Sequence, residues 1–201
     1  GICPRSWASV QLARAGSMLI SMTRHKDDFY PTPPQATRAL LRRESFDHYI
    51  WEPAAGNGAL VNVLTEAGHG VIASDLNTYG FCKAGIDFLM ESKLPEVLRP
   101  VRHLITNPPY RLAENFISHA IHLGCTKHAY LLRLSFLEGV GRHQRLFSKH
   151  PPARIHVFSH RLTIWRGDQD RTSTGTTAYG WFVWDAGETH SPIIEWISDG
   201  E

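Results

Sequence analysis

Residues 105–110 read Ile-Thr-Asn-Pro-Pro-Tyr and place an amide, a proline carbonyl and a phenol directly after a predicted strand. That strand covers residues 101–106, and the two prolines that follow prevent both continued ladder pairing and an immediate helix. The chain must therefore turn in an extended loop. This acceptor loop, residues 107–110, presents Asn107, Pro108 and Tyr110 at the end of the strand.

Such a loop suits chemistry on an amine whose lone pair is delocalised into a ring. Acceptors that bind both hydrogens of the amine favour its pyramidal, nucleophilic form, and the Asn107 side-chain oxygen and the Pro108 carbonyl are two such acceptors. The flat face of Tyr110 suits a stacked ring, as in enzymes that flip bases out of a duplex. Because Asn-Pro and Pro-Pro are common in ordinary turns, the loop alone leaves a purely structural role open.

A second motif lies upstream, where a predicted strand ends at Glu52 and Gly56-x-Gly58 opens a helix. A strand, a glycine-rich turn and a helix form half of a nucleotide-binding unit, although the third glycine of dinucleotide-binding sites is absent. The next predicted strand ends in Asp75, about 20 residues past the glycines, where an acid can accept hydrogen bonds from ribose hydroxyls. We therefore expect Asp75 to bind a ribose.

Together the two motifs resemble the class I S-adenosylmethionine-dependent methyltransferases, and specifically the amino-methyltransferases that carry an Asn-Pro-Pro-Tyr motif. The chain is most similar to small phage- and prophage-type DNA N6-adenine methyltransferases, over residues 27–197 approximately. Three further segments carry the likeness: Tyr-Pro-Thr-Pro-Pro at 30–34, Leu-Leu-Arg-Leu-Ser-Phe-Leu-Glu at 131–138, and Ala-Tyr-Gly-Trp-Phe-Val-Trp at 178–184.

The resemblance implies S-adenosyl-L-methionine as cofactor, with its amino group at Glu52 and its methionine side covered by Tyr30 and Thr32. It also implies that Asp87 accepts from the adenine amine while Phe88 packs on the adenine ring. A packing role for Tyr30 and a capping role for Asp87 stay open. The expected cofactor contacts are Tyr30, Thr32, Glu52, Ala54, Gly56, Gly58, Asp75, Leu76, Asp87, Phe88 and Asn107, and the expected catalytic residues are Asn107, Pro108, Pro109 and Tyr110.

The order of apolar segments predicts an α/β fold, a Rossmann-like, doubly wound seven-stranded sheet that is mostly parallel. The resemblance implies that the last, C-terminal strand is inserted antiparallel. We expect strands at 49–51, 71–75, 86–89, 101–106, 129–134, 154–158 and 178–184. We expect helices at 34–43, 58–67 and 112–123, and a fourth that Ser135-x-x-Glu138 caps and that runs through Phe147.

The 201 residues suit one domain, and 42% hydrophobic with 20% charged residues is ordinary for a soluble globule. Three cysteines without Cys-x-x-Cys spacing predict neither a disulfide framework nor a metal site and favour a reducing compartment. Residues 1–26 contain no acidic residue, and we expect them to be an N-terminal extension, disordered or non-native, outside a methyltransferase domain at 27–201. No stretch is long enough to span a membrane, and we expect a cytoplasmic protein of a bacterial or phage-infected cell.

Basic residues gather towards the C-terminal third, where residues 142–171 hold seven lysines and arginines against two aspartates. This run can track phosphates, although an ordinary solvated surface also explains it. A polar connection at about 159–177 is the expected recognition loop, in which Trp165 either stacks on a base or anchors the loop. The expected substrate contacts are Tyr110, Arg142, Arg161, Trp165, Arg166 and Arg171.

The sequence thus predicts an enzyme that transfers a methyl group from S-adenosylmethionine to an exocyclic amine, adenine N6 in DNA in particular. RNA adenine, cytosine N4 and a protein glutamine stay open as acceptors, because the same tetrapeptide serves all of them. A catalytically silent nucleic-acid-binding subunit also stays open. The chain has no room for a large target-recognition region, so relaxed specificity or a separate specificity partner remains an alternative, and so does a homodimer.

Overall fold

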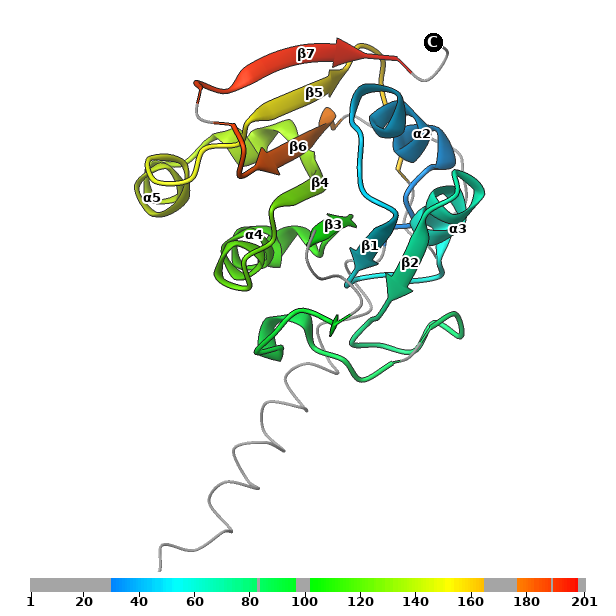
Figure 1. Cartoon of the computed structure of the whole chain (residues 1–201). Coiled ribbons are helices and arrows are strands. Elements are labelled where there is room, and N and C mark those ends of the chain that lie inside the picture. Colours follow the sequence, from blue (N-terminus) through cyan, green and yellow to red (C-terminus); the bar gives the residue numbers. More distant parts are fainter. Residues whose placement is uncertain (1–29, 83, 97–101, 165–176, 189, 199–201) are drawn as a thin grey trace, which may run out of the picture.

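The computed structural model describes residues 30–82, 84–96, 102–164, 177–188 and 190–198, and Figure 1 shows its central sheet between two layers of helices. The sheet contains seven strands in the order β2-β1-β3-β4-β6-β5-β7. The strands are β1 (Tyr49–Glu52), β2 (Gly70–Ala73), β3 (His103–Thr106), β4 (Lys127–Arg133), β5 (Arg154–Phe158), β6 (Tyr179–Asp185) and β7 (Ile193–Ile197).

Strand direction confirms the predicted fold class. Every neighbouring pair is parallel except the two pairs that contain β6, which runs antiparallel to β4 and to β5. The strand is buried along nearly its whole length, as expected of a strand with aromatic residues on both faces. The carboxyl ends of the six other strands therefore lie at one edge of the sheet, where open α/β sheets bind their ligands.

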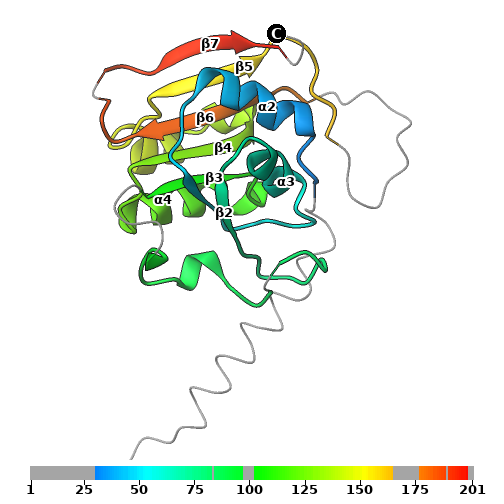
Figure 2. The same cartoon turned by 45° about the vertical axis from the view of Figure 1, so that its right-hand side comes forward.

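Helices cover both faces of the sheet. On one face α2 (Pro34–Arg43) and α3 (Ala59–Glu66) pack with Ile50, Ile105 and Leu131, and Figure 2 shows these helices in front of the strands. On the other face lie α4 (Ala113–His122) and α5 (Val140–Arg142), which continues as a π-helical turn through Phe147. Three short 3₁₀ turns complete the described structure: η2 (Phe88–Met90), η4 (Tyr110–Leu112) and η5 (Leu134–Leu137).

The predicted strand at 86–89 is wrong, because this segment ends in the 3₁₀ turn η2. The Asp87 side chain accepts a hydrogen bond from the Leu89 amide at 3.0 Å and so caps the turn. Two backbone hydrogen bonds, from Gly85 to Leu76 and from Ile86 to Asp75, hold the segment next to the end of β2. A side chain that bonds its own backbone competes with ladder formation, and here it prevails.

The predicted capping box at Ser135-x-x-Glu138 is also wrong. Residues 134–137 form η5, and the following helix begins only after Gly139, without any side-chain cap. Gly139 adopts φ of 112°, a conformation that redirects the chain between the two turns. The helix still reaches Phe147, as predicted.

Strand β7 was not predicted. It pairs in parallel with β5 from Arg154↔Ile193 to Phe158↔Ile197 and forms one edge of the sheet. The loss of the strand at 86–89 makes the aromatic strand the sixth in chain order rather than the seventh, and β7 keeps the total at seven. In the part of the chain that the structure describes, no helix is long and apolar enough to cross a membrane. The predicted extension at 1–26 lies outside the described residues.

Candidate functional site

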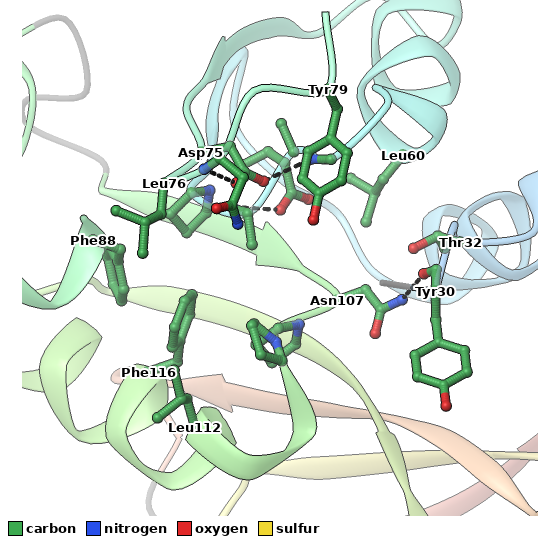
Figure 3. Close-up of a pocket in the computed structure, with 18 of the residues that line it drawn as sticks. Tyr30, Thr32, Leu60, Asp75, Leu76, Tyr79, Phe88, Asn107, Leu112 and Phe116 are labelled. Atoms are coloured by element: carbon green, nitrogen blue, oxygen red, sulfur yellow. Dashed lines mark hydrogen bonds between the residues drawn. The ribbon is translucent and has the colours of Figure 1, made fainter. Parts of the chain in front are cut away.

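A cavity of about 370 Å³ opens at the carboxyl ends of β1, β2 and β3 (Figure 3). It lies between the turn that follows β1 and the acceptor loop that follows β3, as the positions of the two sequence motifs require. The predicted residues that line it are Tyr30, Thr32, Glu52, Ala54, Gly56, Asp75, Leu76, Asp87, Phe88, Asn107, Pro108, Pro109 and Tyr110.

Glu52 is the buried acid of this cavity. Its Oε1 accepts hydrogen bonds from the Thr106 hydroxyl at 2.5 Å and from the Ala54 amide at 3.1 Å, which join the ends of β1 and β3. Its Oε2 is buried and has no hydrogen-bond partner among the described residues. Burial raises the pKa of Glu52 to about 8, an effect that the nearby Asp75 carboxylate reinforces. A cation or a hydrogen-bond donor bound at Oε2 would stabilise the ionised form of this carboxyl.

Asp75 fixes the glycine-rich turn against β2. Its Oδ2 accepts from the Gly56 amide at 2.9 Å, and its Oδ1 accepts from the Asn77 amide at 2.8 Å. The neighbouring Ser74 hydroxyl accepts from the Trp51 indole at 3.0 Å. These bonds hold the Asp75 carboxylate at the cavity wall, where a carboxylate is an acceptor suited to the hydroxyl groups of a ligand.

Aromatic rings form the cavity wall next to Asp87. Phe88 is 2% exposed, and its ring centroid lies 4.8 Å from that of Phe116 and 5.1 Å from that of Trp51. Figure 3 shows Phe88 and Phe116 side by side at one end of the cavity. Asp87 caps η2 through its Oδ1, which is the capping role left open by the sequence, and it also lines the cavity. A flat apolar ring next to a carboxylate suits an aminopurine.

Asn107 has a defined amide orientation. Its Nδ2 donates a hydrogen bond to the Tyr30 carbonyl at 2.8 Å, and only the nitrogen of the amide can donate to a carbonyl (Figure 3). The side-chain oxygen is therefore the atom left to accept from a ligand. The same bond attaches the segment before α2 to the acceptor loop. Tyr30 therefore orients Asn107 through its backbone carbonyl and also lines the cavity.

Two further tyrosine rings and one arginine lie next to Tyr110 of the acceptor loop. The Tyr110 ring centroid is 5.6 Å from that of Tyr30 and 6.0 Å from that of Tyr179, and the Arg133 guanidinium lies 4.6 Å from the Tyr110 centroid. Sequence reasoning did not assign Tyr179 or Arg133 to the site. It also missed Leu60, Tyr79, Leu112 and Phe116, which line the cavity. The spacing of Leu112 and Phe116, one helical turn apart directly after the acceptor loop, was the available signal.

Three of the predicted site residues that the structure describes do not line the cavity. Gly58 does not line the cavity and instead precedes α3 as its N-cap residue, with φ of 81° and beside the Phe81 ring. Arg142 donates to the Phe136 and Glu138 carbonyls at 2.7 Å each and lies over the Phe136 ring. Arg161 is exposed and does not line the cavity. The remaining predicted substrate contacts, Trp165, Arg166 and Arg171, lie outside the described residues.

No family model matches the chain, and no curated protein matches it in sequence. Solved structures do resemble it. A modification subunit assigned to a type I restriction enzyme of Vibrio vulnificus has 14% identity and a TM-score of 0.56, and the match covers 98% of this chain and 53% of that subunit. This chain thus spans about half the length of the subunit.

Two further structures belong to proteins named for their action on RNA or adenosine. A protein assigned as an RNA methyltransferase of Pyrococcus horikoshii has 17% identity, 78% coverage of this chain, 86% coverage of its own and a TM-score of 0.52. A dimethyladenosine transferase of Plasmodium falciparum has 12% identity, 78% and 62% coverage and a TM-score of 0.50. At these identities the likeness establishes a shared fold.

Proposed function

We propose that this chain transfers a methyl group from S-adenosyl-L-methionine to an exocyclic amine, and that adenine N6 in DNA is the acceptor. The single observation that carries the proposal is the orientation of Asn107. Its amide nitrogen is bonded to the Tyr30 carbonyl, which leaves the amide oxygen for an amine beside a cavity of cofactor size. Cavities of about 300–1,000 Å³ are typical of small-molecule sites.

The residues of the cavity fit S-adenosylmethionine, the cofactor expected of such a site. The buried Glu52 Oε2 suits the ammonium of its amino acid, because an opposite charge would compensate the cost of ionising this carboxyl. Asp75 suits the ribose hydroxyls, and Phe88 with Phe116 suits the adenine. When bound, this cofactor supplies an electrophilic methyl group.

The acceptor loop would bind and orient the amine. The Asn107 Oδ1 and the Pro108 carbonyl accept its two hydrogens, which directs the nitrogen lone pair out of the ring plane. Tyr110 offers a face on which the ring of the acceptor can stack. No strong base is needed, because the amine becomes acidic once methylated. The contribution of the protein is alignment and the exclusion of water.

A nucleic acid is the substrate class that the neighbouring structures favour. Their names refer to a restriction-enzyme modification subunit, an RNA methyltransferase and a dimethyladenosine transferase. We choose DNA within this class because the sequence resembles small DNA adenine methyltransferases over the two motifs. The resemblance likewise supports Tyr30, Thr32, Ala54, Gly56, Leu76 and Asp87 as cofactor contacts.

The test is methyl transfer from tritiated S-adenosylmethionine to unmethylated DNA, RNA and protein in parallel, followed by nucleoside mass analysis. We expect N6-methyladenine in DNA. N6-methyladenine in RNA alone, N4-methylcytosine or methylglutamine would replace the proposed acceptor and keep the chemistry. Calorimetry that detects no uptake of S-adenosylmethionine would instead favour a catalytically silent subunit and overturn the proposal.

A further inference from the structure

Arg133 ends β4 at the ligand-binding edge of the sheet, directly beside the acceptor loop. Ala129 and Leu131, four and two residues before it, pack on the face that α2 and α3 cover, so the alternation of the strand places Arg133 on the same face. Its cross-strand partner in β6 is Tyr179. The guanidinium lies 4.6 Å from the centroid of the Tyr110 ring.

Within the described structure, Arg133 lacks the carboxylate partners that Arg154 and Arg145 have. Arg154 pairs with Glu44, Asp185 and Glu188, and Arg145 pairs with Glu114. Arg133 has no carboxylate within ion-pair distance among the described residues, and its Nε is buried without a hydrogen-bond partner there. Partial burial lowers the pKa of Arg133, but a hydrogen bond to the Tyr179 side chain and the neighbouring Tyr110 and Tyr30 raise it overall, so the guanidinium stays a cation beside the acceptor loop. A ligand anion would replace the water that this cation has lost.

The position of Arg133 selects the kind of anion. Tyr110 lines the cofactor cavity and Arg133 does not, so a group bound by Arg133 would stay outside the cavity while a ring stacks on Tyr110. A nucleotide has this layout, because its base can enter and its phosphate remains in the chain. The planar guanidinium donates two parallel hydrogen bonds to a phosphate, which an ammonium cannot do.

We propose that Arg133 binds the phosphodiester next to the extruded nucleotide, so that the site accepts a nucleic-acid strand rather than a protein glutamine or a free amine. The inference rests on the proposed function, since it takes the acceptor loop as the site of the reacting amine. The backbone phosphate is common to DNA and RNA, and the experiment separates these two sources.

The experiment compares Arg133→Gln, Arg133→Lys and the control Arg38→Gln in the full chain. Arg38 lies on α2, pairs only with the exposed Glu66 among the described residues and takes no part in the site, yet its loss removes the same charge. Binding of labelled oligonucleotides, as single-stranded DNA, duplex DNA and RNA of one sequence, is measured by fluorescence anisotropy over a series of salt concentrations. Thermal unfolding verifies that each variant folds.

We expect Arg133→Gln to weaken nucleic-acid binding about tenfold, the effect of losing a charge-assisted hydrogen bond. The slope of log affinity against log salt should fall by roughly 0.7 for a single strand and roughly 0.9 for a duplex, the value of one phosphate contact. Arg133→Lys should retain most of the slope, and Arg38→Gln should change neither quantity. The nucleic acid with the larger loss identifies the source of the phosphate.

An unchanged salt slope with a lower kcat would overturn the inference, because Arg133 would then only position the Tyr110 ring. Binding and methylation of an acidic peptide that depend on Arg133 would overturn it as well. The proposed function is judged separately on the wild-type chain, by uptake of S-adenosylmethionine and by methyl transfer. If both are observed while the slope is unchanged, the phosphate contact alone is refuted.

Discussion

At the scale of single residues, two side chains carry most of the chemical argument, Asn107 and Glu52. Asn107 is oriented by a hydrogen bond to a backbone carbonyl, so its acceptor oxygen is placed before any ligand arrives. Glu52 is buried, its Oε1 accepts two hydrogen bonds, and its Oε2 has no hydrogen-bond partner within the described part of the chain. Asn107 is thus preorganised, whereas Glu52 can still accept a hydrogen bond or an ion pair. This combination is expected of a site that binds a charged cofactor.

The first prediction concerns Asn107→Ala. The change removes the acceptor for the amine, and we expect turnover to fall by about a hundredfold or more, as for the loss of one preorganised polar group. Affinity for S-adenosylmethionine, measured by calorimetry, should stay nearly intact. Asn107→Asp keeps an acceptor oxygen and loses the donor to the Tyr30 carbonyl, so its turnover should lie between that of the wild type and that of Asn107→Ala. The control is Asn62→Ala on the exposed side of α3. Substantial methylation by Asn107→Ala would discredit the assignment.

The second prediction uses the pKa of Glu52, which burial raises from 4.5 to about 8. The folded chain then holds a proton that the unfolded chain releases above pH 4.5. Stability should therefore fall as pH rises from about 4.5 to 8, by up to roughly 1.4 kcal/mol per pH unit from this group, and level off above pH 8. Glu52→Gln cannot ionise, so its stability should lack this contribution. The difference between the two chains in urea unfolding, measured across that pH range, isolates it.

S-adenosylmethionine provides the complementary measurement. If its ammonium lies at Glu52, binding near pH 7 should release a proton, since the cation lowers the pKa of the carboxyl. Calorimetry in buffers of different ionisation enthalpy detects this release, and Glu52→Gln should not show it. Equal proton release by both chains would place the ammonium elsewhere.

At the scale of elements, the helices and strands predicted correctly are those whose starts or ends are set by residues close by in the sequence. Proline at the start of α2, the glycine turn before α3 and the Asn-Pro-Pro break after β3 each act within a few residues, and the structure has each element there. Strand β7 has no such cause. Its residues, Ile-Ile-Glu-Trp-Ile, do not alternate between apolar and polar, and four of the five are exposed. Its pairing with β5 depends on contacts distant in sequence.

The candidate site divides in the same way. Motif residues at strand ends converge because parallel strands end at one edge, which sequence patterns can anticipate. The group around Tyr110 comes together from the segment before α2, from β4 and from β6. Sequence patterns did not show that Tyr179 would lie opposite Arg133, because the antiparallel register of β6 with β4 sets that pairing.

The third prediction tests how tightly β6 is held between its neighbours. A Cβ at Gly180 would lie 2.9 Å from the His156 carbonyl oxygen and 3.2 Å from the Leu134 side chain. Gly180→Ala should therefore lower the free energy of unfolding by about 1–3 kcal/mol, the usual cost of overpacking. Gly187→Ala, in the turn after β6, meets only the Asp185 carboxylate at 3.6 Å and should stay within about 0.5 kcal/mol of wild type. Equal unfolding midpoints in urea would show that β6 can shift without cost.

At the scale of the whole molecule, the side of the sheet at the carboxyl ends of the parallel strands and the side at their amino ends have separate roles. The carboxyl edge holds the cavity, and the opposite edge holds an ion network around Glu44, the residue that ends α2. Glu44 accepts from Lys127 at 2.7 Å, from His156 at 2.8 Å and from Arg154. Arg154 also pairs with Asp185 at 3.1 Å. The network thus joins α2 to β4, β5 and β6, while the other end of α2 leads to Tyr30 and the site.

The last prediction follows from this network. Burial raises the pKa of Glu44, but hydrogen bonds from His156, Arg154 and Lys127 outweigh it and lower the pKa from 4.5 to about 2. The stabilisation is therefore complete above pH 4.5 and is lost as pH falls from there towards 2. Glu44→Gln removes the most buried acceptor of Lys127 and Arg154 and leaves them the more exposed Asp185 and Glu188, which should cost about 1.5–3 kcal/mol at pH 7.

Urea unfolding of wild type and Glu44→Gln at pH 7 and at pH 3 measures this effect, because the difference between the chains should shrink at the lower pH. The control is Glu66→Gln, which removes a carboxylate of the exposed pair with Arg38 and should change stability by less than about 0.5 kcal/mol at either pH. A Glu44→Gln chain as stable as wild type at pH 7 would mean that the network contributes no net stability. In that case α2, and with it the Tyr30 segment beside the cavity, would be held mainly by the apolar contacts of Leu40 and its neighbours and by the hydrogen bond from the Trp181 indole to the Ala36 carbonyl.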